Sequence, residues 1–134
     1  AAVAKYYSSV SEGYYLGCLT GGSLGFHART GGAIVQANTT TAWDDGNWHY
    51  IAGERNGTRA RAFLDAGASG ATASIACTTG SMDAAGRNMG IAALDTGSWG
   101  SFFIGDVGEV RLSDIARSNP WKRPRKPWKS RKKP

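Results

Sequence analysis

Apolar and polar residues alternate in short runs along most of this chain, and pairs of glycine, asparagine and aspartate separate the runs. Alternation with a period of two predicts β-strands that turn one face toward a core, and the separators are typical of tight turns. No stretch has a sustained helical period. Residues 113–118 could form one helical turn at most. The pattern therefore predicts an all-β sandwich. Strands are expected at 13–19, 24–29, 33–36, 48–55, 60–64, 71–78, 89–94 and 102–112.

Length and composition narrow the class of protein. The chain has 134 residues, which suffices for one domain with a buried core, and its 19 glycines suit many turns. No apolar stretch reaches the roughly 20 residues that a membrane helix needs, so we expect no membrane span. Cys18 and Cys77 both lie in apolar, strand-like surroundings. Two interpretations stay open for them: a pair of buried reduced thiols, or one disulfide formed in an oxidising compartment.

The positive charge is concentrated at the C-terminal end. Residues 1–119 contain eight Lys and Arg residues against ten acids, a net charge of −2, whereas residues 120–134 contain eight and no acid, a net charge of +8. We therefore divide the chain into a sandwich domain, 1–119, and an extended basic tail, 120–134. The prolines of the tail favour an extended path. Its candidate contact residues are Trp121, Lys122, Arg123, Arg125, Lys126, Trp128, Lys129, Arg131, Lys132 and Lys133.

Three kinds of partner suit a tail that mixes tryptophan with lysine and arginine. Single-stranded nucleic acid would stack on the indoles and neutralise the charge, and an anionic membrane surface would bind the same residues. The third partner is an acidic surface on a protein neighbour. We favour the protein neighbour, within a homo-oligomer or a capsid-like or surface-bound assembly, and rank nucleic acid below it.

Three blocks of the sequence resemble a known family. The run FFIGDVGEVRL at 102–112, followed by ARS, is similar to the "G-x-I-D-E-V-R-I" closing strand of the laminin-G/concanavalin A-like lectin superfamily. Residues 44–52 resemble its "D-G-x-W-H-x-V-A" strand and residues 59–67 its "x-L-Y-V-D-G" strand. Gly108 replaces the usual aspartate, and the Asp-Gly turn is lengthened by one alanine. The resemblance covers roughly residues 13–118.

The resemblance implies an antiparallel jelly-roll sandwich that serves binding or adhesion and is displayed outside the cell or on a virion surface. Relatives carry further strands before the position of Ala1. A sheet short of one strand would expose an unpaired edge to other chains. Alternatively, residues 2–10 supply that strand themselves.

The sequence contains no convincing catalytic set. Glucanases of this fold use paired carboxylates in an "E-x-D-x-x-E" arrangement on one strand. The nearest acids here, Asp106 and Glu109, are three residues apart and would face opposite sides of a strand. His27 and His49 have no companion motif, and we interpret both as structural or surface residues. We therefore expect no enzyme activity.

Loop residues offer a candidate carbohydrate site. Tryptophan can stack on a sugar face while aspartate and asparagine bind its hydroxyls, although core packing and turn formation explain the same residues. The loop oxygens also suit calcium, and we expect no other cofactor. We assign Trp48 to the core. The candidate ligand-binding residues are Trp43, Asp44, Asp45, Asn47, Asp95 and Trp99.

Taken together, the sequence predicts a non-enzymatic surface module. The favoured interpretation is a virion or phage decoration or adhesion protein whose basic tail anchors it to a larger assembly. The first alternative is an extracellular carbohydrate-binding module of a bacterial adhesion or glycan-degrading protein. The second is contact with a polyanion or nucleic acid through the tail.

Overall fold

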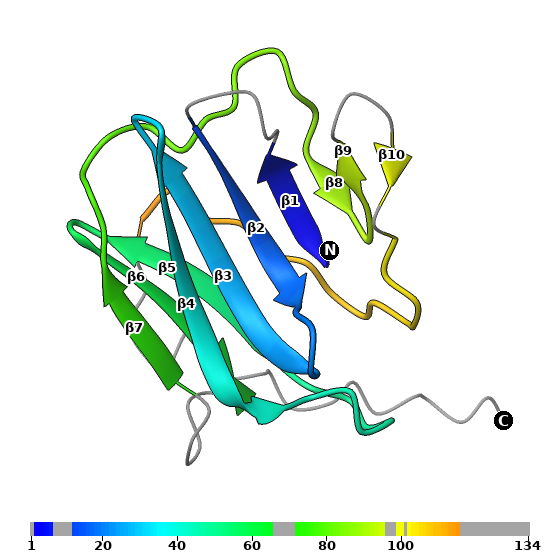
Figure 1. The fold of residues 1–134 in the computed structure, drawn as a ribbon. Coiled ribbons are helices and arrows are strands. Elements are labelled where there is room, and N and C mark those ends of the chain that lie inside the picture. The colour runs from blue at the N-terminus through cyan, green and yellow to red at the C-terminus, as the bar shows by residue number, and fades with distance from the viewer. Residues whose placement is uncertain (1, 7–11, 66–71, 96–98, 101, 116–134) are drawn as a thin grey trace, which may run out of the picture.

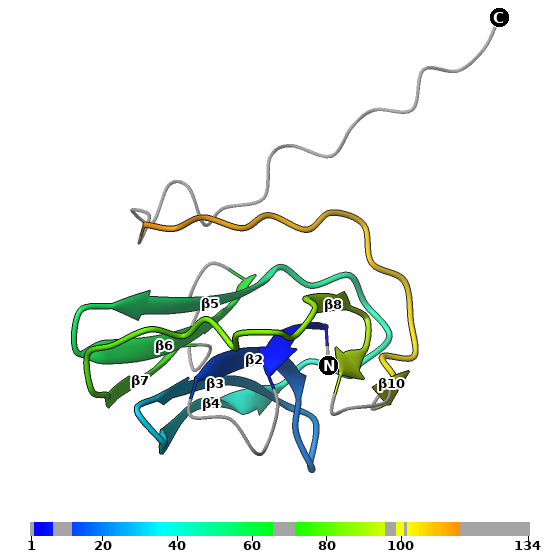
Figure 2. The ribbon, with the colours of Figure 1, turned by 90° about the horizontal axis from the view of Figure 1, so that it is seen from above.

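The computed structural model describes residues 2–6, 12–65, 72–95, 99–100 and 102–115. Within these residues the regular elements are all strands, and none is an α-helix. A five-stranded sheet and a three-stranded sheet face each other, and a two-stranded ladder lies beside them (Figure 1 and Figure 2). Every strand pair in the described part is antiparallel. The prediction of an antiparallel β-sandwich is confirmed.

The five-stranded sheet has the order β4-β3-β2-β1-β8. Gly31 and Gly32 join β3 to β4 with φ angles of 56° and 85°, which residues with a side chain rarely adopt. Residues 3–6 form β1. The segment 2–10, for which the sequence left open whether it forms a strand, therefore contributes one to this sheet. The strands are β1 (Val3–Tyr6), β2 (Gly13–Cys18), β3 (Ser23–Thr30), β4 (Ala33–Ala42) and β8 (Gly90–Ile91).

The smaller sheets contain β5 (Ile51–Asn56), β6 (Arg59–Leu64) and β7 (Thr72–Ala76), in that order, and the ladder of β9 (Leu94–Asp95) with β10 (Trp99–Gly100). Asn56 pairs with Arg59 across a two-residue turn, in which Gly57 has a φ of 57°. A turn of this length fixes the register of a hairpin. It places residue 50, just before β5, opposite residue 65, just after β6.

The core lies between the three-stranded sheet and the β3–β4 side of the larger sheet. Alternate residues of the strands point into it, as the period of two requires. Four of its seven buried members are alanines, so the two sheets approach each other closely. Because five strands face three, β1 and β2 extend beyond the smaller sheet. The members are Leu24, Phe26, Ala28, Ala37, Ala60, Ala62 and Leu64.

Two predicted strands differ in the structure. The run 89–94 is divided between β8 and β9, since Ala92 adopts a φ of 60° between them. Residues 102–112 form no strand, although their pattern alternates. This segment continues along the sandwich beside the three-stranded sheet (Figure 2), where the backbone N–H of Phe103 donates to the carbonyl oxygen of Ala92 at 2.8 Å. Alternation specifies the two faces of a strand, but it does not supply the neighbouring strand that completes a ladder.

The two cysteines are both free thiols. Cys77 is half-buried directly after β7, whereas Cys18 is exposed at the end of β2. The expectation of burial is therefore wrong for Cys18. This residue is the last of β2, and the smaller sheet does not cover β2.

Candidate functional site

The loop at residues 43–50 connects the two facing sheets, from β4 to β5. Inside the loop, the backbone N–H of Asn47 donates to the carboxylate of Asp45 at 2.9 Å, and Gly46 between them has a φ of 81°. A carboxylate that accepts a hydrogen bond from the backbone two residues later is typical of a tight turn. At the start of the loop, the backbone N–H of Trp43 donates to the carbonyl oxygen of Gly22 at 3.0 Å.

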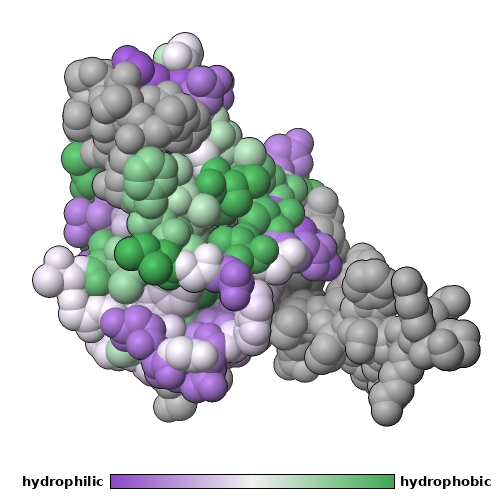
Figure 3. All heavy atoms as spheres, turned by 90° about the vertical axis from the view of Figure 1, so that its right-hand side faces the viewer, coloured by the Kyte–Doolittle hydropathy of each residue, from purple (hydrophilic) through white to green (hydrophobic). Residues whose placement is uncertain are grey.

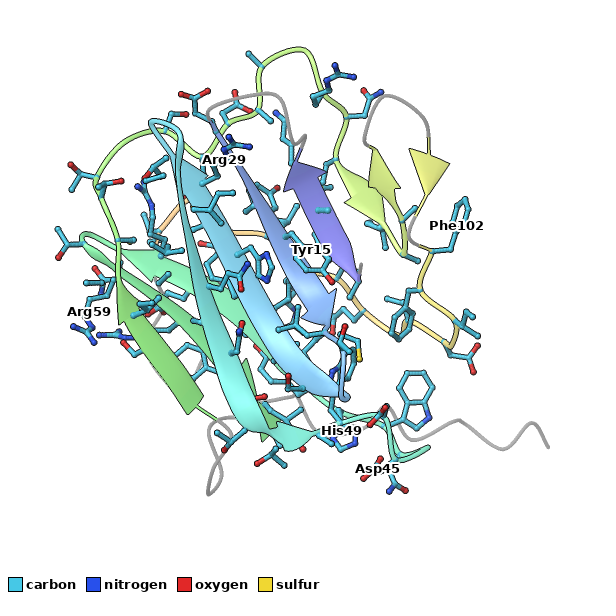
Figure 4. The ribbon with its side chains drawn as sticks, viewed as in Figure 1. Tyr15, Arg29, Asp45, His49, Arg59 and Phe102 are labelled. Carbon is cyan, nitrogen blue, oxygen red and sulfur yellow. The ribbon has the colours of Figure 1, made fainter. Side chains whose placement is uncertain are left out.

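His49 lies between two carboxylates. Its Nε2 is 2.8 Å from Oδ1 of Asp45, and its Nδ1 is 2.8 Å from Oδ2 of Asp65. Two acceptors of this kind favour the imidazolium, in which both ring nitrogens donate. The ring therefore links the loop to the end of β6 (Figure 4).

Asp65 also holds the backbone at the start of β5. The N–H of Tyr50 donates to Oδ1 of Asp65 at 3.0 Å, and the N–H of Asp65 donates to the carbonyl oxygen of Tyr50 at 2.8 Å. Asp65 adopts a φ of 49°, in the left-handed region that aspartate tolerates better than most residues. Sequence reasoning missed Asp65, although the hairpin register at the Asn56-Gly57 turn would have placed it opposite position 50.

The electrostatics of this cluster follow from its hydrogen bonds. The pKa of His49 is raised above its ordinary value by the bonds to Asp45 first and to Asp65 second. The pKa of Asp45 is lowered to about 2 by the bond from His49, with the Asn47 backbone next in importance. Hydrogen bonding to a charged form favours that form, and here each partner stabilises the charge of the other.

Trp48 projects from the same loop and is 72% exposed. Our assignment of this residue to the core is therefore wrong. The benzo edge of the indole lies near Gly108, where an added Cβ would be 3.5 Å from Cζ3 of Trp48. The turn at 45–47 and the fixed ring of His49 leave Trp48 on the outer side of the loop, since the core behind β5 is already filled by other residues.

The other candidate residues of the loop have different surroundings. Trp43 is half-buried and stacks on Phe103 with ring centroids 5.9 Å apart. The carboxylate of Asp44 lies over Gly22, where a Cβ would come within 2.3 Å of Oδ1. Trp43 and Asp44 therefore pack the loop against the larger sheet, whereas Asp45 and Asn47 form its outer turn.

The remaining candidates can be placed only in part. Asp95 and Trp99 are backbone partners across the β9–β10 ladder, but their side chains lie outside the described residues. The candidate residues of the basic tail also lie outside them. Among the residues that are described, no group of three or more His, Cys, Asp and Glu side chains is arranged to hold a metal ion.

Two further groups among the described residues, Glu109 and His27, have contacts of their own outside the loop. Glu109 accepts two hydrogen bonds from the guanidinium of Arg111, at 2.6 and 2.8 Å. His27 packs edge-on against Tyr15, with ring centroids 4.9 Å apart, and burial lowers its pKa. In the Asp45–His49–Asp65 cluster both ring nitrogens are engaged, so neither is available as a general base.

A second surface, beside the loop, is apolar. Figure 3 shows hydrophobic side chains gathered on the side of the molecule where residues 102–107 and β8 lie. Phe102 and Ile91 are well exposed there, and Ile104 is 97% exposed. A contiguous apolar surface is a feature of protein contacts.

The comparison with known proteins agrees with this fold. A family model described as the concanavalin A-like lectin/glucanases superfamily matches residues 1–121. No curated protein and no solved structure gives a significant match. Among the described residues, none forms a helix long and apolar enough to cross a membrane. The family match and the all-β sandwich indicate a carbohydrate-binding or structural module. The chain belongs to the concanavalin A-like lectin/glucanase superfamily.

Proposed function

We propose that this domain binds carbohydrate through the outer turn of the 43–50 loop, without catalysing a reaction. The observation that carries the proposal is the exposed indole of Trp48 in the same loop as the carboxylate of Asp45 and the amide of Asn47. An indole offers a flat apolar surface to one face of a sugar ring. Carboxylate and amide groups in the same loop can accept and donate hydrogen bonds to the hydroxyls around that ring.

The fixed geometry of the loop supports this proposal. Asp45 is held by the Asn47 backbone and by His49, and His49 is held in turn by Asp65. Polar groups that are already positioned need little reordering when a ligand binds. The Asp45 carboxylate is ionised at neutral pH, and its lowered pKa keeps it a hydrogen-bond acceptor in acidic solution, where an ordinary aspartate would begin to be protonated.

A glycan array followed by calorimetry tests the proposal. We expect the wild-type domain to bind a subset of glycans and the Trp48→Ala variant to lose roughly two- to twelvefold in affinity, since an aromatic stack contributes about 0.5–1.5 kcal/mol. Ile34→Ala is the matched control, because Ile34 is also an exposed apolar residue but lies on β4. Absence of glycan binding by the wild type, or equal losses in the two variants, would refute the proposal.

The basic tail supports a second candidate function, anchoring to an assembly. Residues 120–134 carry a charge of +8 and the preceding residues −2, so a neighbouring subunit of the same kind offers the opposite charge. The apolar surface at Phe102 and Ile104 adds a further contact area. On this proposal, the chain is a domain, 1–119, and a tail, 120–134, and serves as a virion, phage or other extracellular surface protein.

Deletion of residues 120–134 separates the two candidates. Anchoring predicts that the truncated protein folds, still binds glycan and no longer joins the assembly of the full chain. Incorporation of the truncated protein would contradict the anchoring role. If the full chain bound DNA with an affinity that fell steeply with salt concentration, contact with a polyanion would replace anchoring as the role of the tail.

A further inference from the structure

The apolar surface beside the 43–50 loop comes from two segments that are far apart in the sequence. The backbone N–H of Phe103 donates to the carbonyl oxygen of Ala92, which holds the two segments side by side. Their exposed apolar side chains therefore form one surface (Figure 3). Ile104 is 97% exposed, and a contiguous group of such residues is a feature of contact sites. The members of the apolar surface are Ile91, Phe102, Ile104 and Val107.

The segments that build and border this surface carry negative charge. Residues 43–50, 90–95 and 102–108 contain four aspartates and no lysine or arginine. Asp106 is exposed and stands between two members of the surface in the sequence. The nearby cation, His49, is bound between two carboxylates, so that cluster remains negative overall. A partner that matches this surface therefore combines apolar groups with positive charge.

The negative charge argues against two simple occupants. A second copy that presented the same surface would place aspartates opposite aspartates, and like-charge repulsion opposes such an interface. An anionic membrane would be repelled for the same reason, because its surface potential attracts basic segments.

The basic tail of the chain has the required composition. Residues 120–134 contain eight lysines and arginines and no acid. Trp121 and Trp128 stand among these cations, each directly after a proline. An indole can bury about 150–250 Å² in a contact, which suits an exposed apolar surface. The lysines and arginines would then face the aspartates around it.

The tail follows a segment that leads away from the apolar surface. Residues 102–115, yellow to orange in Figure 2, pass along the sandwich from the side of β10 to the side of the β5–β6 turn. Trp121 comes six positions after Ile115, whereas Ile104 lies eleven positions before it. Because the reach of a chain is proportional to its number of residues, six residues are too few to lead Trp121 back to this surface. The surface that both tryptophans can reach belongs to another copy.

We propose that the apolar surface binds residues 120–134 of a neighbouring copy, so that copies of the chain join head to tail. This inference rests on the anchoring role proposed above and names the surface to which the tail binds. The two contact areas on one copy are different, so the contact is heterologous. Heterologous contacts close into a ring, of which a reciprocal dimer is the smallest, or continue as an open chain.

Analytical ultracentrifugation of the full chain and of three double variants tests the proposal. We expect the wild type to associate as its concentration rises, and less strongly at high salt. The surface variant and the tail variant should each lose at least about tenfold in affinity, since each loses the burial of two apolar side chains. The control removes two exposed apolar side chains from elsewhere and should keep the wild-type affinity. The variants are Phe102→Ser/Ile104→Ser for the surface, Trp121→Ala/Trp128→Ala for the tail and Ile34→Ser/Ile115→Ser for the control.

A mixture of the surface variant and the tail variant is the sharpest measurement. The surface variant keeps its tail and the tail variant keeps its surface, so one intact contact remains between them. At a concentration where neither variant associates alone, we expect a 1:1 complex that does not grow further. A tail that binds its own copy would give no complex in the mixture, and this result would overturn the proposal.

Three other results would also overturn it. A wild-type chain that stays monomeric up to about 1 mM would show that the contact is absent. Equal affinities of the wild type and the surface variant would exclude the apolar surface. If only the tail variant lost its association, the anchoring role would stand and the tail would bind a different surface. Should the surface variant unfold, dilution of the wild type must shift the NMR signals of Ile91 and Ile104 and leave those of Ile34 in place, and unchanged signals of Ile91 and Ile104 refute the proposal.

Discussion

Gly53 is the position where a single added methyl group should disturb the sandwich most. It lies in the middle of β5 and faces the ring of Phe26 on β3. An ideal Cβ on Gly53 would lie 2.2 Å from Cδ2, 2.7 Å from Cγ and 2.8 Å from Cε2 of that ring. Phe26 is 4% exposed and belongs to the core cluster, so the ring has little room to withdraw. Replacement by alanine must therefore displace the ring or separate the sheets.

The magnitude follows from two opposing effects. Alanine in a strand is favoured over glycine by about 0.5–1 kcal/mol, because the unfolded chain loses less entropy. Overpacking a filled core costs about 1–3 kcal/mol. With a contact this short, the second effect dominates, and we expect Gly53→Ala to lower the free energy of unfolding by about 1–2 kcal/mol. For a chain of this size, the midpoint of thermal unfolding should fall by roughly 3–8 °C.

Urea denaturation followed by circular dichroism measures this change. Gly108→Ala is the control, since its Cβ would meet Trp48 at an ordinary 3.5 Å, and we expect little effect. Phe26→Leu should partly rescue Gly53→Ala, with a coupling of at least about 1 kcal/mol in a double-mutant cycle. If Gly53→Ala is as stable as the wild type, or if the two changes are additive, the close packing of β5 on β3 is refuted.

Three further predictions concern charge, reactivity and packing. In an NMR titration, His49 should titrate above its ordinary pKa of 6.5 and His27 below it, and the reverse order would contradict the hydrogen bonds of His49. Because the pKa of His49 is raised in the folded state, its charge stabilises the fold fully below pH 6.5, and this contribution is lost as the pH rises through the pKa of the folded state. The free energy of unfolding, measured from pH 6 upward, should therefore decrease in the wild type. The His49→Ala variant should not show this decrease. A thiol reagent should modify Cys18 much faster than Cys77 in the native state, and equal rates would contradict their different exposure. Leu64→Ala should lower the free energy of unfolding by about 2–5 kcal/mol, because Leu64 is 2% exposed, and a smaller loss would indicate a looser core.

Most of the fold could be predicted from the sequence because strands and turns are encoded locally. The alternation of residues 24–29 and the Asn56-Gly57 turn define β3 and the β5–β6 hairpin without reference to distant residues. Residues 102–112 show the limit of this reasoning. Their alternation is equally clear, yet a strand is completed only by a neighbour, and the pattern does not name one.

The candidate site was predictable only where it is local. Asp45 and Asn47 form a turn two residues apart, and their place on the loop follows from the sequence. Asp65 is brought next to His49 by the pairing of β5 with β6, and the two residues are 16 positions apart in the sequence. No short sequence motif therefore contains both. Trp48 was misplaced because an apolar side chain at the start of a strand is usually buried, whereas here Phe26 and the alanines already fill the space behind β5.

The attachment of the 43–50 loop at both ends has a thermodynamic consequence. The backbone N–H of Trp43 is hydrogen-bonded to Gly22 in the β2–β3 turn of the larger sheet, and the ring of His49 is hydrogen-bonded to Asp65 at the end of β6 in the smaller sheet. A loop held in this way has little conformational entropy left to lose when a ligand arrives. Association should therefore proceed with a small entropic penalty and without a slow rearrangement. Loss of the His49–Asp65 bond would slow association and make the binding entropy more unfavourable, even if every group that touches the ligand were retained.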